Sequence, residues 1–302
     1  TFSITASADG CPGSPAFATV LVNPTADAFA SPASQSVCSG LAITTIALTG
    51  NTSGTVYNWE RNNTGTVTGM ANSGSGNIAG ILNNTTNADI TVTFTITPFI
   101  NGCPGTITTA TVLVKPTPVV AATPFTQTVC NNTLVSISLT NPNNVSGTDY
   151  IWNRDNILIL TGVANNGIGN TISGTISNGS GVTQTTTINI TGTAANGCSG
   201  TSTATILVYA TEIAPDISEA QTVCIFSTPA ALNGTPATGG SGSFMYQWQS
   251  SPNNIVWNNN GGATALTYQP PGINAGSQNT YYRLRAIGTC STLYSDSIYI
   301  EV

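Results

Sequence analysis

The sequence predicts an all-β protein of tandem antiparallel sandwiches, and three observations support this fold class. Apolar residues alternate with polar, β-branched ones in short runs, of which residues 90–96 are the clearest. Turn-forming pairs separate such runs, and Asn101-Gly102 and Asn196-Gly197 each predict a tight hairpin. A segment of about 90 residues recurs along the 302-residue chain.

Two cysteine positions and one tryptophan mark this repeat. The first cysteine ends a Gln-Ser/Thr-Val-Cys sequence and recurs after 92 and 94 residues. The second follows a glycine turn and recurs after 92, 95 and 92 residues, and a Tyr-x-Trp sequence keeps the same spacing. These residues are Cys38, Cys130 and Cys224; Cys11, Cys103, Cys198 and Cys290; and Trp59, Trp152 and Trp248.

The spacing predicts three complete repeats and part of a fourth. We expect residues 1–23 to be the C-terminal part of a truncated repeat, because they match only the last part of the later ones. Complete repeats are predicted at 24–116, 117–210 and 211–302. About seven short strands in each make a two-sheet sandwich, and short proline-containing joints predict a linear rod with contacts between neighbours only. The last repeat is richer in aromatic residues, so we expect it to have a larger core.

Six segments of the first two complete repeats have the composition and alternation of half-buried strands. They are residues 42–48, 90–96, 109–114, 134–139, 186–190 and 203–208. The Tyr-x-Trp sequences belong on the third strand of each sandwich, where residues two apart point to the same face. We therefore predict that Trp59, Trp152 and Trp248 fill the core between the sheets, although aromatic residues that stack on sugars are an alternative.

Composition argues against several kinds of partner and chemistry. The net charge is −6 with only five Lys and Arg residues, which predicts no nucleic-acid partner, and no apolar run is long enough to insert into a membrane. The chain has no histidine, so it cannot form a Ser-His-Asp or Cys-His arrangement from its own residues. No Asp-x-Asp cluster favours calcium. We expect no enzyme activity, no cofactor and no bound metal.

The cysteines favour disulfides over metal ligation. They are regularly placed, none belongs to a Cys-x-x-Cys pair, and no histidine could complete a metal site. Disulfides persist in oxidising compartments, so the chain is expected to be exported.

The repeated phrases resemble a known family. Val-Cys-x-Gly ahead of a strand, Tyr-x-Trp, and Asn-Gly-Cys ahead of Ala-Thr-Val-Leu-Val resemble the PKD-like, immunoglobulin-like repeats of giant Bacteroidota surface proteins. Residues 246–251 and 281–283 resemble a second immunoglobulin-like repeat type from the same proteins. The family includes gliding-motility adhesins of the SprB type, which are exported by the type IX secretion system. The resemblance implies an extracellular or cell-surface location.

The spacing allows three schemes of cysteine pairing. The staggered scheme joins Cys38–Cys198 and Cys130–Cys290; the scheme within repeats joins Cys38–Cys103, Cys130–Cys198 and Cys224–Cys290; the scheme across joints joins Cys11–Cys38, Cys103–Cys130 and Cys198–Cys224. In an immunoglobulin-like strand order the two cysteine positions lie at opposite ends of a sandwich, roughly 30 Å apart. This favours the staggered scheme, because a disulfide needs Cα atoms within about 7 Å. Another strand order would allow pairing within a repeat.

Four functions are compatible with these features. The leading hypothesis is a stalk or fibre segment of a long extracellular adhesin, whose partners are the neighbouring repeats of the same chain and whose role could be in gliding motility. A second is a module that binds surface polysaccharide through exposed aromatic residues of the last repeat, such as Trp257, Tyr268 or Tyr281. A third is an accessory region of a secreted enzyme. The fourth is a self-assembling filament, in which the partner is another copy of the chain.

Overall fold

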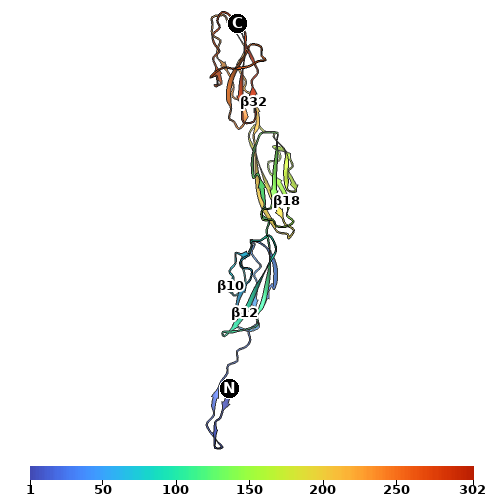
Figure 1. Cartoon of the computed structure of the whole chain (residues 1–302), viewed down its shortest axis with the longest axis vertical. Helices are drawn as coiled ribbons and strands as arrows, with labels where there is room; N and C mark the ends of the chain where they lie inside the picture. Colours follow the sequence, from blue (N-terminus) through green and yellow to red (C-terminus); the bar gives the residue numbers. More distant parts are fainter. The chain divides into compact units, whose positions relative to one another are not determined.

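The structure is a computed structural model that describes all residues, 1–302, and consists of strands and loops only (Figure 1). It divides into two compact units. Unit 1 comprises Thr1–Pro118, Asn143–Thr148 and Thr193–Ser199, and unit 2 comprises Val119–Pro142, Asp149–Gly192 and Gly200–Val302. The predicted all-β class, with tandem sandwich domains, is confirmed.

Unit 1 contains one sandwich. Its larger sheet has the order β10-β8-β12-β14-β6, and β13 pairs with β12. The other layer is made of the short ladders β5-β7 and β11-β9 with two isolated bridges. The strands are β5 (Phe29–Ser31), β6 (Ser34–Cys38), β7 (Ala47–Thr49), β8 (Val56–Arg61), β9 (Val67–Thr68), β10 (Ser73–Ser75), β11 (Asn83–Asn84), β12 (Ile90–Ile100), β13 (Cys103–Pro104) and β14 (Thr108–Lys115).

Strand β12 shows how the sequence forms this core. Val92, Phe94 and Ile96 are fully buried, and the threonines between them face outward, as a strand period of two requires. The ring of Trp59 on β8 meets Phe94 edge to face, with centroids 5.7 Å apart. The remaining buried members come from both layers and form one cluster with these residues.

The predicted strand at 42–48 is wrong for most of its length. Only β7 at its end is a strand, and Ala42 and Ile46 form single bridges. The side chain of Gln35 takes the place of a neighbouring strand, because its Nε2 donates to the carbonyl of Thr44 and its Oε1 accepts the Thr44 N–H, both at 2.8 Å. Gln221 makes the same pair of bonds with Ala230. The glutamine of the repeated Gln-x-Val-Cys sequence therefore shapes this edge.

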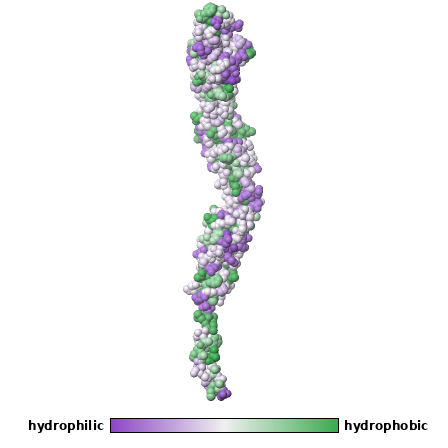
Figure 2. Space-filling view, turned by 60° about the vertical axis from the view of Figure 1, so that its left-hand side comes forward, coloured by the Kyte–Doolittle hydropathy of each residue, from purple (hydrophilic) through white to green (hydrophobic).

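The N-terminal residues of unit 1 form two short ladders. Strand β1 (Phe2–Ile4) pairs with β4 (Ala16–Ala18), and β2 (Ser7–Ala8) pairs with β3 (Cys11–Pro12). Their apolar side chains are largely exposed, and hydrophobic colour gathers at this end of the chain in Figure 2.

Unit 2 contains two sandwiches, each with its own core. In the first, a sheet of order β16-β23-β22-β18-β20 faces a sheet of order β15-β17-β21-β19, and Trp152 lies between them. The strands are β15 (Ala121–Thr123), β16 (Thr126–Val129), β17 (Thr133–Thr140), β18 (Asp149–Arg154), β19 (Leu160–Val163), β20 (Asn166–Ile168), β21 (Thr171–Asn178), β22 (Gln184–Thr193) and β23 (Ser199–Val208).

The second sandwich of unit 2 has the sheet order β25-β33-β31-β28-β29, with β32 paired to β31, and is closed by β24-β27 and β26-β30. The strands are β24 (Ala210–Ile213), β25 (Gln221–Thr222), β26 (Leu232–Asn233), β27 (Thr238–Gly240), β28 (Met245–Ser251), β29 (Asn258–Asn259), β30 (Thr267–Tyr268), β31 (Thr280–Ile287), β32 (Thr292–Tyr294) and β33 (Ile298–Glu301). The expected larger core is wrong: its buried cluster is smaller than the other two. Part of its aromatic content lies on the outer face instead.

The sheets are antiparallel with one repeated exception. The Gln-x-Val-Cys sequence is itself a strand and runs parallel to the last strand of each sandwich: β6 with β14, β16 with β23, and β25 with β33. In unit 1, β5 pairs with β7 in the smaller layer. The chain then continues in the same direction and joins the larger sheet as β6, beside β14. This crossing puts Cys38 directly beside Lys115, where β14 ends.

Candidate functional site: the disulfide joints

Two disulfides join cysteines that are far apart in the sequence. Cys38 and Cys198, both in unit 1, have Cα atoms 5.7 Å apart, and Cys130 and Cys290, both in unit 2, have Cα atoms 5.6 Å apart. Each bond spans 160 residues and follows the staggered scheme. Together with the sandwich fold, such bonds indicate a secreted or extracellular protein.

The other two pairing schemes do not occur. Cys11, Cys103 and Cys224 are free and exposed, so Cys38–Cys103, Cys130–Cys198 and Cys224–Cys290 are not formed, nor are the pairs across joints. In unit 1, Cys38 lies beside Lys115, at the far end of β14 from the hairpin that holds Cys103. The length of β14 separates them by roughly 23 Å, whereas a disulfide tolerates about 7 Å between Cα atoms.

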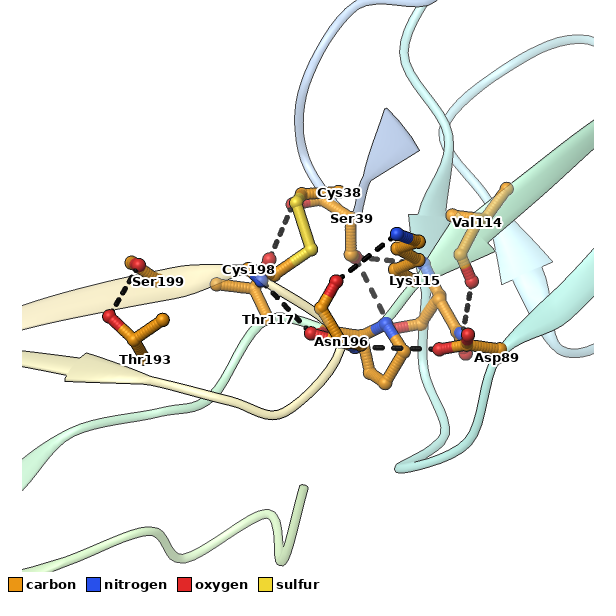
Figure 3. The surroundings of a disulfide bond; sticks show 12 residues. Cys38, Ser39, Asp89, Val114, Lys115, Thr117, Thr193, Asn196, Cys198 and Ser199 are labelled. Atoms are coloured by element: carbon orange, nitrogen blue, oxygen red, sulfur yellow. Dashed lines mark hydrogen bonds between the residues drawn. A yellow bond between two sulfur atoms is a disulfide. The ribbon is translucent and has the colours of Figure 1, made fainter. Parts of the chain in front are cut away.

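Asn196 organises the turn that carries Cys198 (Figure 3). Its side-chain Oδ1 accepts the Cys198 N–H at 3.0 Å, and its Nδ2 donates to the carbonyl of Pro116 at 3.0 Å and to Asp89 Oδ1 at 3.4 Å. Its own carbonyl accepts a hydrogen bond from Lys115 Nζ at 3.1 Å. One side chain thus ties the cysteine turn to the segment that follows β14.

The two Asn-Gly hairpins differ in backbone conformation, because only Asn196 uses its side chain to hold a cysteine turn. Asn101 and Gly102 both have positive φ, 48° and 79°, as the type I′ turn requires. At the equivalent pair only Gly197 has a positive φ, 86°, and its N–H donates to the carbonyl of Ala194 at 2.9 Å. The side chain of Asn196 is used at the joint instead.

Glu212 has the corresponding place beside Cys290. Its Oε1 accepts the Cys290 N–H at 3.0 Å, and its Oε2 accepts the hydroxyl of Ser291 at 2.6 Å. Gly240 and Gly288 give it room, because a Cβ at either position would lie only 2.4 or 2.3 Å from its carboxylate. The two joints therefore share the disulfide and differ in the side chain that supports it.

Two buried arginines brace the first two sandwiches. Arg61 donates to the carbonyls of Val67, Met70 and Ala71 at 2.8–3.0 Å. Arg154 makes the equivalent bonds in the second sandwich, to the carbonyls of Leu160, Val163 and Ala164. Burial lowers the pKa of both guanidinium groups. Sequence analysis missed this feature, although the Trp-x-Arg sequence at 59–61 and 152–154 signals it.

The three repeated tryptophans lie in the cores. Trp59, Trp152 and Trp248 are 9%, 7% and 0% exposed. The indole Nε1 of Trp248 donates to the carbonyl of Ala265 at 3.0 Å, whereas those of Trp59 and Trp152 are buried without a partner. Gly74 and Gly167 lie against the rings of Trp59 and Trp152.

The aromatic residues considered for sugar binding divide into two groups. Tyr268 lies against the core, where its ring is 5.8 Å from that of Trp248 and 6.0 Å from that of Tyr282. Trp257 contacts Arg283, and Tyr281 contacts Tyr299, away from this cluster. Tyr268 is partly buried, and its packing against the core leaves less of its ring for a ligand, so its role in sugar binding stays a prediction.

No group of three or more His, Cys, Asp or Glu side chains is placed to hold a metal ion. No helix in the structure has the length and apolar character needed to cross a membrane.

Comparison with solved structures gives distant likenesses. Domains of titin match at 13% identity with a TM-score of 0.36, covering 86% of this chain and 91% of that one. The EC22-24 segment of mouse cadherin-23 matches at 12% identity and 0.30, covering 89% and 95%, and the EC1-4 segment of Drosophila N-cadherin at 10% and 0.35, covering 89% and 73%. These likenesses concern the fold alone. No curated protein sequence matches this chain.

Sequence families give a closer assignment. The PKD-like domain family matches residues 35–118 and 127–213, which together make up more than half of the chain. A family described as a domain of unknown function, DUF8696, matches residues 213–302. The PKD-like repeat fold is typically a non-catalytic, structural domain. The chain belongs to the PKD-like domain family.

Proposed function

We propose that this chain is a structural segment of a long extracellular adhesin or fibre, in which disulfide-linked repeats carry tension and hold an adhesive tip away from the cell. The observation that carries the proposal is the disulfide pattern. With repeats at 24–116, 117–210 and 211–302, each disulfide joins the first cysteine of one repeat to the second cysteine of the next. The matched family ranges lie close to these bounds.

The two disulfides close overlapping loops. Residues 39–197 lie inside the loop closed by the first bond, and residues 131–289 lie inside the loop closed by the second. The shortest covalent path runs from the N-terminus to Cys38, across to Cys198, back along the chain to Cys130, and across to Cys290. Tension would therefore be carried by both disulfides and by the part of the second repeat that lies between them. Unfolding of the oxidised chain would release much less length than unfolding of the reduced chain.

The polar side chains also fit a structural role. Asp27 accepts hydrogen bonds from the backbone and the side chain of Asn51, and Asp155 accepts the N–H of Thr187 at 2.7 Å. Glu212 supports the turn at Cys290. These acids are engaged in loops rather than gathered in a cleft, so the proposal assigns no catalysis to the chain.

The cellular setting is part of the proposal. The resemblance to gliding-motility adhesins of the SprB type supports attachment at the cell surface and export by the type IX secretion system. The reading frame of the parent protein tests this part, because a type IX sorting domain at its C-terminus is the expected finding. A secreted enzyme domain in the same frame would instead favour the accessory role.

Single-molecule stretching tests the mechanical part. The oxidised chain, held at its two ends, should extend by no more than about 117 residues, or roughly 400 Å, and the reduced chain by roughly 1,050 Å. Replacing Cys38 and Cys198 with serine opens one loop, so the oxidised double variant should reach about 141 residues, or roughly 490 Å. An oxidised chain that extends as far as the reduced one would refute the proposal.

A further inference from the structure

Two of the five cations in the chain are bound by neither a backbone carbonyl nor a carboxylate. Arg61 and Arg154 are enclosed by backbone carbonyls, and Lys115 donates to a loop carbonyl. The other two, Arg283 and Arg285, lie two residues apart on β31, so their side chains leave the same, outer face of the strand. These two arginines place two positive charges close together in a chain whose net charge is −6.

The guanidinium of Arg283 is held in a fixed plane. Its Cζ lies 4.2 Å from the ring centroid of Trp257 and 4.1 Å from that of Tyr294. Its Nε donates to Gln249 Oε1 at 2.8 Å. The edge that carries the two terminal nitrogens makes no hydrogen bond to the protein, so the fork that pairs with a carboxylate is already oriented and unoccupied.

Arg285 adds a second positive charge to this face. Its Nε is buried and has no hydrogen-bond partner, and the residue lies opposite Tyr294 on β32 and Gln247 on β28. Burial, opposed by the Tyr294 phenol and reinforced by the charge of Arg285, lowers the pKa of Arg283. No carboxylate is among the groups that act on Arg283. A bound oxyanion would pair with the free terminal nitrogens of Arg283 and relieve the repulsion between the two cations.

The same face continues into a hollow beside Tyr281. This residue precedes Arg283 by two positions, and its ring lies 4.7 Å from that of Tyr299. The hollow has a volume of about 490 Å³. Its lining residues are the two tyrosines and Pro252, Asn253, Gln278 and Asn279. Amide side chains both donate and accept hydrogen bonds, as sugar hydroxyls require. From Tyr281 to Arg285 the strand runs roughly 13 Å.

This chemistry is confined to the last repeat. Strands β12 and β31 are equivalent, because each pairs with the strand that carries the buried tryptophan: Ile96 lies opposite Trp59, and Leu284 lies opposite Trp248. The residues of β12 that face outward in place of the Tyr and Arg residues are threonines. Electrostatic attraction of the whole, acidic chain cannot draw in a polyanion, so any binding has to come from a local site.

We propose that the outer face of β31, from Tyr281 through Arg283 to Arg285, binds an acidic polysaccharide through its uronate carboxylates. A carboxylate pairs with the terminal nitrogens of Arg283, and the next acidic group lies beside the positive charge of Arg285 on the same face. Neighbouring sugar rings lie against the tyrosines of the hollow, where the amides meet their hydroxyls. A polyglutamate chain would also pair with the arginines, but it has no rings to lie against the tyrosines of the hollow. This binding role does not depend on the tension-bearing role.

The test is to measure, by titration calorimetry at low ionic strength, the binding of polygalacturonate to the complete 302-residue chain. Arg285→Gln should weaken binding by about tenfold, and Tyr281→Ala should also weaken it. Lys115→Gln is the matched control, since it removes one positive charge outside the site and should leave binding unchanged. Circular dichroism checks that each variant remains folded, and Arg283→Lys tests the planar fork independently, with weaker binding expected.

Three results would overturn the proposal. The first is no binding of polygalacturonate to the unmodified chain. The second is an equal loss for Lys115→Gln and Arg285→Gln, which would indicate general charge attraction. The third is equally tight binding of polyglutamate that Tyr281→Ala leaves unchanged, which would point to an acidic peptide instead. Neutral dextran should not bind.

Discussion

Asn196 holds the turn of Cys198 against the segment that follows β14. Its Oδ1 accepts the Cys198 N–H and its Nδ2 donates to the carbonyl of Pro116, both at 3.0 Å. The disulfide to Cys38 is therefore accompanied by a hydrogen-bonded amide that keeps the cysteine backbone in place.

Replacing Asn196 with alanine should loosen this joint. The loss of these bonds should lower the free energy of unfolding by about 1–2 kcal/mol and make the Cys38–Cys198 bond easier to reduce than Cys130–Cys290. Timed reduction by dithiothreitol, followed by alkylation and mass spectrometry, measures both bonds in one sample. Asn189→Ala is the control, because this amide makes a single bond of 3.4 Å to Asn153. Unchanged reduction rates for both disulfides would show that Asn196 has no such role.

The buried arginines should matter for stability. Arg154→Met removes the donors of three backbone carbonyls and should lower the free energy of unfolding by about 2–4 kcal/mol. Arg154→Lys should recover only part of the loss, because one ammonium cannot reach all three acceptors. Urea unfolding followed by tryptophan fluorescence measures the effect. Arg285→Gln serves as the comparison, because no backbone carbonyl accepts a hydrogen bond from this arginine, and an equal effect of both substitutions would argue against the carbonyl enclosure.

Gly74 and Gly167 leave space for the core tryptophans. A Cβ at Gly74 would lie 2.4 Å from Trp59 Cζ2, and one at Gly167 would lie 2.5 Å from Trp152 Cζ2. Alanine at either site should therefore force the indole to move and cost about 1–3 kcal/mol. Gly65→Ala is the matched control, because no atom lies within 4 Å of its added Cβ. The thermal midpoint should fall for Gly74→Ala and stay nearly constant for Gly65→Ala; equal shifts would refute the contact.

The stability of the last repeat should depend on alkaline pH. Burial, reinforced by Tyr268, raises the pKa of Tyr282 to about 12, above the ordinary value of 10.0. Between these values the unfolded chain releases the proton and the folded chain keeps it, so stability falls as pH rises from about 10 to 12 and is insensitive to this group below that window. Denaturant midpoints across this range should fall less steeply for Tyr282→Phe than for the unmodified chain. Parallel curves would exclude Tyr282 as the cause.

Much of the fold could be predicted from local patterns. Alternating burial is a property of each strand, so residues 90–96 and 109–114 fall within β12 and β14. Residues 42–48 could not be assigned correctly, because the hydrogen bonds that define their shape come from Gln35, outside the segment. The parallel strand β6 was missed for a similar reason, since crossing between sheets leaves no trace in the alternation.

The joints and the outer face of β31 needed three-dimensional information. The spacing of the cysteines left three pairing schemes open. The structure places Cys38 beside Lys115, and therefore at the end of the sheet from which the chain continues into the next repeat. The aromatic residues of the last repeat suggested a larger core, but alternation along β31 sends Tyr281 and Arg283 outward. Their neighbours Trp257 and Tyr294 come from segments whose positions the sequence does not reveal.

Peptide mapping without reduction tests the linked repeats most directly. Free thiols are alkylated first, and the chain is then digested with pepsin in acid, where thiol–disulfide exchange is slow because little thiolate is present. We predict two cross-linked peptide pairs, Cys38 with Cys198 and Cys130 with Cys290, and alkylated Cys11, Cys103 and Cys224. A peptide pair that joins Cys38 to Cys103 would contradict the linkage between repeats.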